Sequence, residues 1–149
     1  KPTIVFLGDA SAEEDYVFGA IGWASTKKLP IVFVIEDNNL SILTEKKTRR
    51  NWNMHDVGKA FKIQSFDIND DSNEIYKHKS KFFKKPLLLN INTHRLYWHA
   101  GAGKDSDKTF DRYKNEMNKL GKKAYKIHKI TKNSISKLWL KRFEKQLRK

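Results

Sequence analysis

Continuous apolar runs occur at three places in the chain, and each predicts a buried strand. The runs are residues 3–7, 31–35 and 86–91. An unbroken run of this kind is typical of a strand covered on both faces, as in a parallel sheet. Residues 64–68 form a weaker fourth run.

Apolar residues at helical spacing occupy the segments between these strands. Val17, Ala20, Ile21 and Ala24 recur at intervals of three and four, which predicts a helix over residues 12–26. Ser11 is placed to cap this helix, and acidic residues follow in its first turn. Strand and helix alternate, so the fold class is α/β, a Rossmann-like three-layer α/β/α arrangement with a mostly parallel sheet.

Further helices are predicted by the same spacing, and the segment at 36–52 is polar and is expected to form a loop. The predicted helices are residues 56–61, 72–83, 110–120 and 134–147. Gly121 would end the third of the four, and Asn133 or Ser134 would cap the last.

The chain is therefore divided into two parts. We expect an α/β domain over residues 1–121 and a basic amphipathic helical tail over residues 122–149. Because the chain begins inside a predicted strand, we also expect that an N-terminal portion of the domain precedes it.

The formal charge of +14 is concentrated in the second half. Residues 1–70 hold 9 Lys and Arg against 10 Asp and Glu, whereas residues 71–149 hold 22 against 7. A fold that binds nucleic acid would carry a basic face throughout, so nucleic acid is not the partner we expect. A basic nucleic-acid-binding module is kept as an alternative.

Composition also limits the compartment and the class of protein. The chain has no cysteine, which excludes disulfides and thiolate metal sites. No apolar stretch approaches the roughly 20 residues of a membrane span. We expect a cytoplasmic protein without a membrane span.

Polar residues follow the first two strands directly. Gly8 and Asp9 end the first run, and Asn38 follows the second about 30 residues later. The carboxyl ends of parallel strands meet at one edge, where α/β sheets bind ligands. Carboxylate and amide oxygens suit Mg²⁺, and the N–H groups of Ala10 and Ser11 would form an anion site at the helix N-terminus. These residues indicate a Mg²⁺-bridged phosphate.

A purely structural interpretation of the same residues stays open. An aspartate after a strand is often a helix cap, and Asn38-Asn39 is often a turn. The glycine-rich motifs of nucleotide and dinucleotide sites are absent from the sequence.

The stretch from Gly8 to Asn38 resembles the thiamine diphosphate motif, which opens with Gly-Asp-Gly and ends in Asn-Asn about 30 residues later. It is most similar to the alpha subunit of the decarboxylase component of 2-oxo acid dehydrogenases, in which a Leu-Pro strand matches Leu29-Pro30. The resemblance implies that Asp9, Asn38 and the Leu40 carbonyl bind the metal. A slip of one residue would replace Asn38 by Asn39.

A second block resembles the same family. Residues 86–89, followed by the segment 93–99, are similar to that family's strand and its histidine-containing loop. The resemblance implies that His99 lies beside the cofactor, both as a cofactor-binding and as a catalytic residue. In the first block, Ala10 stands at the third motif position, where the family has glycine.

The resemblance implies an enzyme that uses thiamine diphosphate and Mg²⁺. It would decarboxylate a 2-oxo acid and pass the acyl group to lipoamide. The implied partners are a beta subunit, in an α₂β₂ heterotetramer, and a lipoyl acyltransferase. A carboligase or a transketolase-like enzyme with the same motif is the alternative.

Overall fold

The computed structural model describes residues 1–100 and 110–148. They belong to two compact units, Lys1–Phe110 and Asp111–Lys149. The first contains a sheet with its helices, and the second contains a long helix. Among the described residues, no helix is long and apolar enough to cross a membrane.

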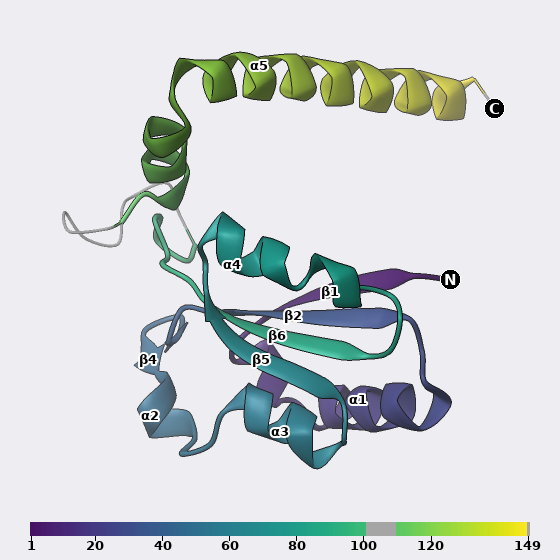
Figure 1. Ribbon diagram of the computed structural model, residues 1–149, viewed down its shortest axis with the longest axis vertical. Coiled ribbons are helices and arrows are strands. Elements are labelled where there is room, and N and C mark those ends of the chain that lie inside the picture. The colour runs from purple at the N-terminus through teal and green to yellow at the C-terminus, as the bar shows by residue number, and fades with distance from the viewer. Residues whose placement is uncertain (101–109, 149) are drawn as a thin grey trace. The chain divides into compact units, whose positions relative to one another are not determined.

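The first unit is built on a parallel sheet of four strands in the order β1-β2-β6-β5 (Figure 1). The strands are β1 (Thr3–Gly8), β2 (Ile31–Asp37), β5 (Gln64–Asn69) and β6 (Leu87–Asn92). All four predicted strands are confirmed, each within two residues of its expected limits. The continuous apolar runs belong to β2 and β6, the two central strands, and to β1 at one edge.

Helices cover both faces of the sheet, as the α/β/α prediction requires (Figure 1). On one face, α1 (Asp15–Lys27) and α3 (Met54–Ala60) enclose a core that contains Ile21, Ile35 and Leu88. On the other, residues of and around α4 (Ser72–Lys77) pack against a second cluster from β2 and β6. Burying these side chains stabilises the fold by about 1.5–3 kcal/mol each.

Strand β1 lies at the edge of the sheet and pairs with β2 alone among the described strands. Its alternate residues Val5 and Leu7 pack against the α1 core. Ile4 and Phe6 point to the opposite face, where they are 41% and 64% exposed. Within residues 1–100, the apolar run of β1 is therefore covered on one face only.

The segment after β2 is more ordered than its polar sequence predicts. It forms the hairpin β3 (Leu40–Ser41) and β4 (Thr44–Glu45), followed by the short helix α2 (Lys46–Arg49). The helix expected at 72–83 is also different, because α4 gives way at His78 to a 3₁₀ turn, η2 (Lys79–Lys81).

The predicted cap at Ser11 is wrong. Ser11–Glu13 form a 3₁₀ turn, η1, and α1 starts at Asp15. Glu14 is the N-cap of α1, and its side chain makes no capping hydrogen bond to the described residues of the helix. The acidic residues thus occupy the turn before the helix as well as its first turn.

The second unit consists of α5 (Arg112–Leu147), in which Gly121 has non-helical angles with φ of 73°. Only a glycine adopts this left-handed region readily, so the predicted interruption at Gly121 is confirmed. The cap predicted at Asn133 or Ser134 is wrong, because the helix runs without a break from 122 to 147. The boundary expected after residue 121 falls at the kink inside α5.

Candidate functional site

The register of β1 and β2 brings the two candidate ligand segments to one edge of the sheet. Gly8 pairs with Glu36 at the ends of the two strands. Asp9 follows Gly8 directly and is buried, while Asn38 follows the last residue of β2 and is half-buried. The convergence expected from the parallel strands is present in the backbone pairing.

Asp9 is bound by an arginine that is 40 residues away in sequence. Arg49, at the end of α2, places Nη2 2.5 Å from Asp9 Oδ2. Its Nη1 lies 2.5 Å from Glu13 Oε1 in the turn η1, and Arg50 Nε lies 3.0 Å from the same oxygen. Helix α2 is thus tied to the segment that follows β1.

Asp37, the last residue of β2, holds the other end of the same helix. Lys46 Nζ lies 2.5 Å from its Oδ2, and Arg50 Nη2 lies 3.7 Å from that atom. The amide of Asn90, on β6, also donates to Asp37 Oδ2 at 3.3 Å. Ion pairs thus join three basic residues of α2 and its C-cap to three acidic residues at the ends of β1 and β2 and in η1. We call these six residues the strand-end ion network: Asp9, Glu13, Asp37, Lys46, Arg49 and Arg50.

The pKa of Asp37 is lowered despite its burial. Burial alone raises this pKa, but the hydrogen bonds from Lys46 and from the backbone N–H of Asn39 outweigh it. Asp37 is therefore an anion at neutral pH. Three carboxylates and three cations make the network neutral as a whole.

The loop after β2 is held by its own side chains. Asn38 Oδ1 accepts a hydrogen bond from the Leu40 N–H at 2.9 Å, and Asp37 Oδ1 accepts one from the Asn39 N–H at 3.0 Å. Asn39 is exposed, with φ of 66°. Asn38 as the metal ligand, in preference to Asn39, stays a prediction.

The backbone N–H groups expected to form an anion site at the N-terminus of α1 lie instead at the 3₁₀ turn η1 that precedes this helix. Ala10 precedes the turn η1, and Ser11 begins it, whereas α1 starts four residues after Ser11. Any backbone N–H groups that bind an anion here belong to the turn, and the dipole of α1 begins farther along the chain.

His99 lies in the segment that leaves β6, and two contacts tie this segment to the region of Asn38. Thr93 N–H donates to the Asp37 carbonyl at 2.8 Å. Arg95 Nη1 donates to the Ile42 carbonyl at 2.7 Å, within the β3–β4 hairpin. His99 itself is exposed, and its role stays a prediction.

Sequence reasoning missed the ion network. The cluster from Lys46 to Arg50 is visible in the sequence, as are the acidic residues after Asp9. Their opposite charge was the available signal. The pairing itself joins residues 36 and 40 positions apart, which no local pattern encodes.

The donors at this edge suit a hard cation. Among the described residues, no group of three or more His, Cys, Asp or Glu side chains is arranged to hold a metal. The predicted set of one carboxylate, one amide and one backbone carbonyl is of another kind, and its oxygens match the preference of Mg²⁺ when phosphate oxygens complete the coordination. The residues therefore fit a Mg²⁺ ion bound together with a phosphate group. In this structure the Asp9 carboxylate is paired with Arg49.

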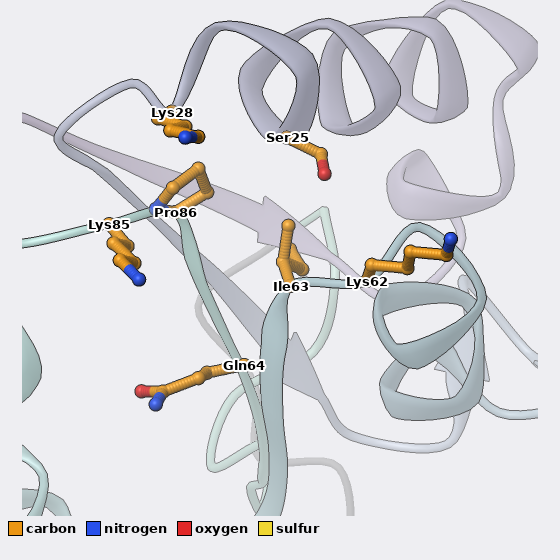
Figure 2. A pocket seen from close by; sticks show the side chains of 7 residues that line it. All are labelled: Ser25, Lys28, Lys62, Ile63, Gln64, Lys85 and Pro86. Atoms are coloured by element: carbon orange, nitrogen blue, oxygen red, sulfur yellow. The ribbon is translucent and has the colours of Figure 1, made fainter.

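A cavity of about 380 Å³ lies at the opposite, amino-terminal ends of the strands (Figure 2). Its lining includes Lys28, Lys62 and Lys85, with Ile63 and Pro86 between them. None of the predicted site residues lines it, so the cavity and the strand-end network are separate features.

Comparison with protein families finds a match over the whole chain. Residues 1–149 match the family described as "Dehydrogenase E1 component". The pyruvate dehydrogenase E1 component subunit alpha of Rickettsia bellii is 31% identical over 105 residues, which cover 64% of this chain and 32% of that protein. The mitochondrial 2-oxoisovalerate dehydrogenase subunit alpha of Caenorhabditis elegans is 24% identical over 143 residues, 91% of this chain and 32% of that protein.

Solved structures show the same fold. A transketolase from Campylobacter jejuni superposes with a TM-score of 0.56 and 26% identity, covering 61% of this chain and 15% of that one. A transketolase from Pichia stipitis gives 0.53 at 20% identity, with coverage of 62% and 15%. The chain spans about a third of the length of the curated relatives that it matches.

Proposed function

Because the chain belongs to the dehydrogenase E1 component family, we propose that it holds the diphosphate end of thiamine diphosphate in a 2-oxo acid dehydrogenase. The observation that carries the proposal is the pairing of Gly8 with Glu36. This pairing sets Asp9 and the loop of Asn38 at neighbouring strand ends, the place where α/β sheets bind ligands.

Three oxygens of this chain would hold Mg²⁺: the Asp9 carboxylate, the Asn38 amide and the Leu40 carbonyl. Gly8, Ala10 and Ser11 would present backbone to the diphosphate. Gly8 suits this role because a Cβ added there meets nothing closer than Ser11 Oγ at 4.0 Å, which leaves room for close approach. Asn38 Oδ1 accepts the Leu40 N–H, and the second lone pair of this oxygen would be available to the metal.

When bound, thiamine diphosphate would supply the carbanion chemistry by which a 2-oxo acid is decarboxylated. The chain's own part is to fix the diphosphate end and thereby orient the reacting ring. His99 would donate a hydrogen bond or move a proton at an imidazole nitrogen beside that ring.

The remaining parts of the reaction would come from other chains. A beta subunit would complete the site in an α₂β₂ heterotetramer, and a lipoyl acyltransferase would take the acyl group. The relatives are named for pyruvate and for 2-oxoisovalerate dehydrogenases, which supports a 2-oxo acid as the proposed substrate class.

Calorimetry with thiamine diphosphate and Mg²⁺ tests the proposal, on the full chain together with its beta subunit. We expect saturable binding by the wild type and a loss of at least about tenfold in affinity in Asp9→Asn, which keeps the shape but removes the metal-binding charge. Asp56→Asn on α3, an exposed aspartate paired with Lys59, is the matched control and should bind as the wild type does. Absence of thiamine diphosphate binding by the wild-type assembly would refute the proposal.

A transketolase-like reaction is the second candidate, favoured by the structural match at 26% identity. The two reactions differ in their acceptors. Turnover that requires lipoamide supports the dehydrogenase, whereas glycolaldehyde transfer from a ketose to an aldose without lipoamide supports the second candidate.

A further inference from the structure

Arg49 lies between two carboxylates at the edge where the metal is proposed to bind. Its two terminal nitrogens are each 2.5 Å from a carboxylate oxygen, one of Asp9 and one of Glu13. The Asp9 side chain is only 3% exposed. A carboxylate buried to this degree needs a cation beside it, and Arg49 is the cation that the described chain provides.

Arg50 gives a second, independent indication at the same edge. Its side chain is 1% exposed, and its Nη1 and Nη2 make no hydrogen bond among the described residues, although Nη2 lies 3.7 Å from Asp37 Oδ2. Ion pairing with Glu13 and stacking on Trp52 hold the guanidinium in place. A fixed, buried guanidinium with unused donors is suited to an anion such as a phosphate group.

A Mg²⁺ ion bound as in the proposed function would compete with Arg49 for the Asp9 carboxylate. A metal ion on Asp9 would sit about 2.1 Å from a carboxylate oxygen, and its double charge would repel the guanidinium bound there. The metal arrives with a diphosphate, whose oxygens are bidentate partners for arginine. The displaced side chain therefore has a new acceptor at the same edge.

We propose that Arg49 is the internal counter-ion of Asp9, that Mg²⁺ displaces it, and that the displaced guanidinium then binds the diphosphate. The inference rests on the proposed function, because it concerns the same metal and cofactor. It makes Arg49, with Arg50 beside it, a diphosphate-binding residue contributed by α2.

The proposal predicts two opposite effects of one substitution. Arg49→Gln should raise the affinity for Mg²⁺ alone by about tenfold, because the competing cation is gone. The same variant should lose about tenfold in affinity for inorganic diphosphate in the presence of Mg²⁺, because a charged donor is missing. Both constants can be measured by calorimetry and by the ligand-dependent shift of the melting temperature, without any assay of turnover.

Lys47→Gln is the matched control. Lys47 lies in the same helix as Arg49, and its substitution by Gln removes the same charge. Its side chain is 80% exposed and pairs only with Glu45 among the described residues. Neither affinity should change by more than about twofold in this variant, since surface pairs contribute little.

The outcomes separate this inference from the proposed function. If the wild type binds magnesium and thiamine diphosphate but Arg49→Gln shifts both affinities in the same direction, or behaves as Lys47→Gln does, the inference is overturned and the function stands. If the wild type binds neither inorganic diphosphate nor thiamine diphosphate, both fall. Should Arg49→Gln fail to fold by circular dichroism, Arg49→Lys carries the same pair of opposite expectations with smaller shifts, because an ammonium group cannot bridge both carboxylates.

Discussion

Charged side chains are buried at the strand ends of this molecule, and each is compensated by a partner of opposite charge, 9 positions away for Asp37 and 40 positions away for Asp9. Asp9, Asp37 and Arg50 are all at least nine-tenths buried. Removing one partner of such a set leaves an unpaired buried charge, which typically costs about 3–5 kcal/mol. The network is therefore a structural unit as well as a candidate binding site, and substitutions within it need a check of folding before any binding result is interpreted.

His78 supports a prediction about pH at the scale of a single residue. Burial against the Phe66 ring, at 4.2 Å between ring centroids, lowers the pKa of His78, and the charges of Lys81 and Lys77 lower it further while Glu74 opposes them. The unfolded chain therefore binds a proton at His78 more readily than the folded chain does. The contribution of His78 to the free energy of unfolding is therefore complete above the pKa of about 6.5 that this side chain has in the unfolded chain, and it decreases as the pH falls below that value.

We expect the free energy of unfolding, measured in urea, to decrease between pH 7.5 and pH 5.5. In His78→Gln this decrease should be smaller, because the side chain no longer titrates. An identical pH dependence in the two proteins would contradict the assignment. His55→Gln, at a half-buried position of α3 beside Asp56, serves as the control.

At the scale of elements, the sequence predicted those strands and helices whose apolar residues follow a regular spacing. The apolar runs located all four strands of the sheet, and the stripe that includes Val17 and Ile21 located α1. The hairpin β3–β4 was missed because its strands have two residues each and its turn contains no glycine, although Ile42 adopts φ of 54°. Local sequence carries no signal for such a turn when a β-branched residue takes the left-handed conformation.

The candidate site was predicted only in part for a related reason. Asp9 and Asn38 follow apolar strands, so their position at one edge could be deduced from the parallel crossover. The contact of Arg49 with Asp9 depends on how the missed hairpin turns the chain back across the strand ends. A pairing of this kind can be predicted only once the tertiary structure is known.

The packing of α3 on β5 makes Gly58 sensitive to substitution. A Cβ at this position would lie 2.6 Å from Ser65 Oγ and 2.8 Å from Ser65 Cβ. Gly58→Ala should therefore destabilise the protein by about 1–3 kcal/mol, despite the higher helix propensity of alanine. Urea unfolding measures the effect, and Ser65→Gly in the same chain should reduce it, because the clashing atoms are removed.

Gly19 in α1 is the matched control for Gly58. A Cβ added at Gly19 meets nothing within 4 Å, so Gly19→Ala should stabilise the protein by about 0.5–1 kcal/mol. A destabilisation of equal size in the two variants would show that helix propensity, and not the contact with Ser65, controls the result.

At the scale of the whole molecule, stability is distributed unevenly between the two units. The sheet unit contains both clusters of buried apolar residues. In α5, Met117 is the buried residue, and every residue from 125 to 147 is exposed. A helix with so little burial opens locally at low cost.

Limited trypsin digestion should therefore cleave α5 first, since its exposed part carries many lysines. Mass spectrometry should detect an early, long-lived fragment that contains residues 1–100 and lacks the C-terminal part of α5. Loss of both units at the same rate would contradict this expectation, and chymotrypsin, which can cut α5 near Trp139 and Phe143, provides an independent test.

In the part of the chain that the structure describes, no strand pairs with the outer edge of β1, and this affects how the 149-residue polypeptide behaves at high concentration. Exposed strand edges with apolar side chains are templates for another strand, and here Ile4 and Phe6 add an apolar surface beside the edge. The charge of +14 keeps separate molecules apart, but at about 0.15 M salt this repulsion reaches only about 8 Å. High salt, which is commonly added to prevent nonspecific binding by basic proteins, therefore removes the electrostatic barrier to edge-to-edge association. The polypeptide should stay monodisperse longest in a dilute, low-salt buffer.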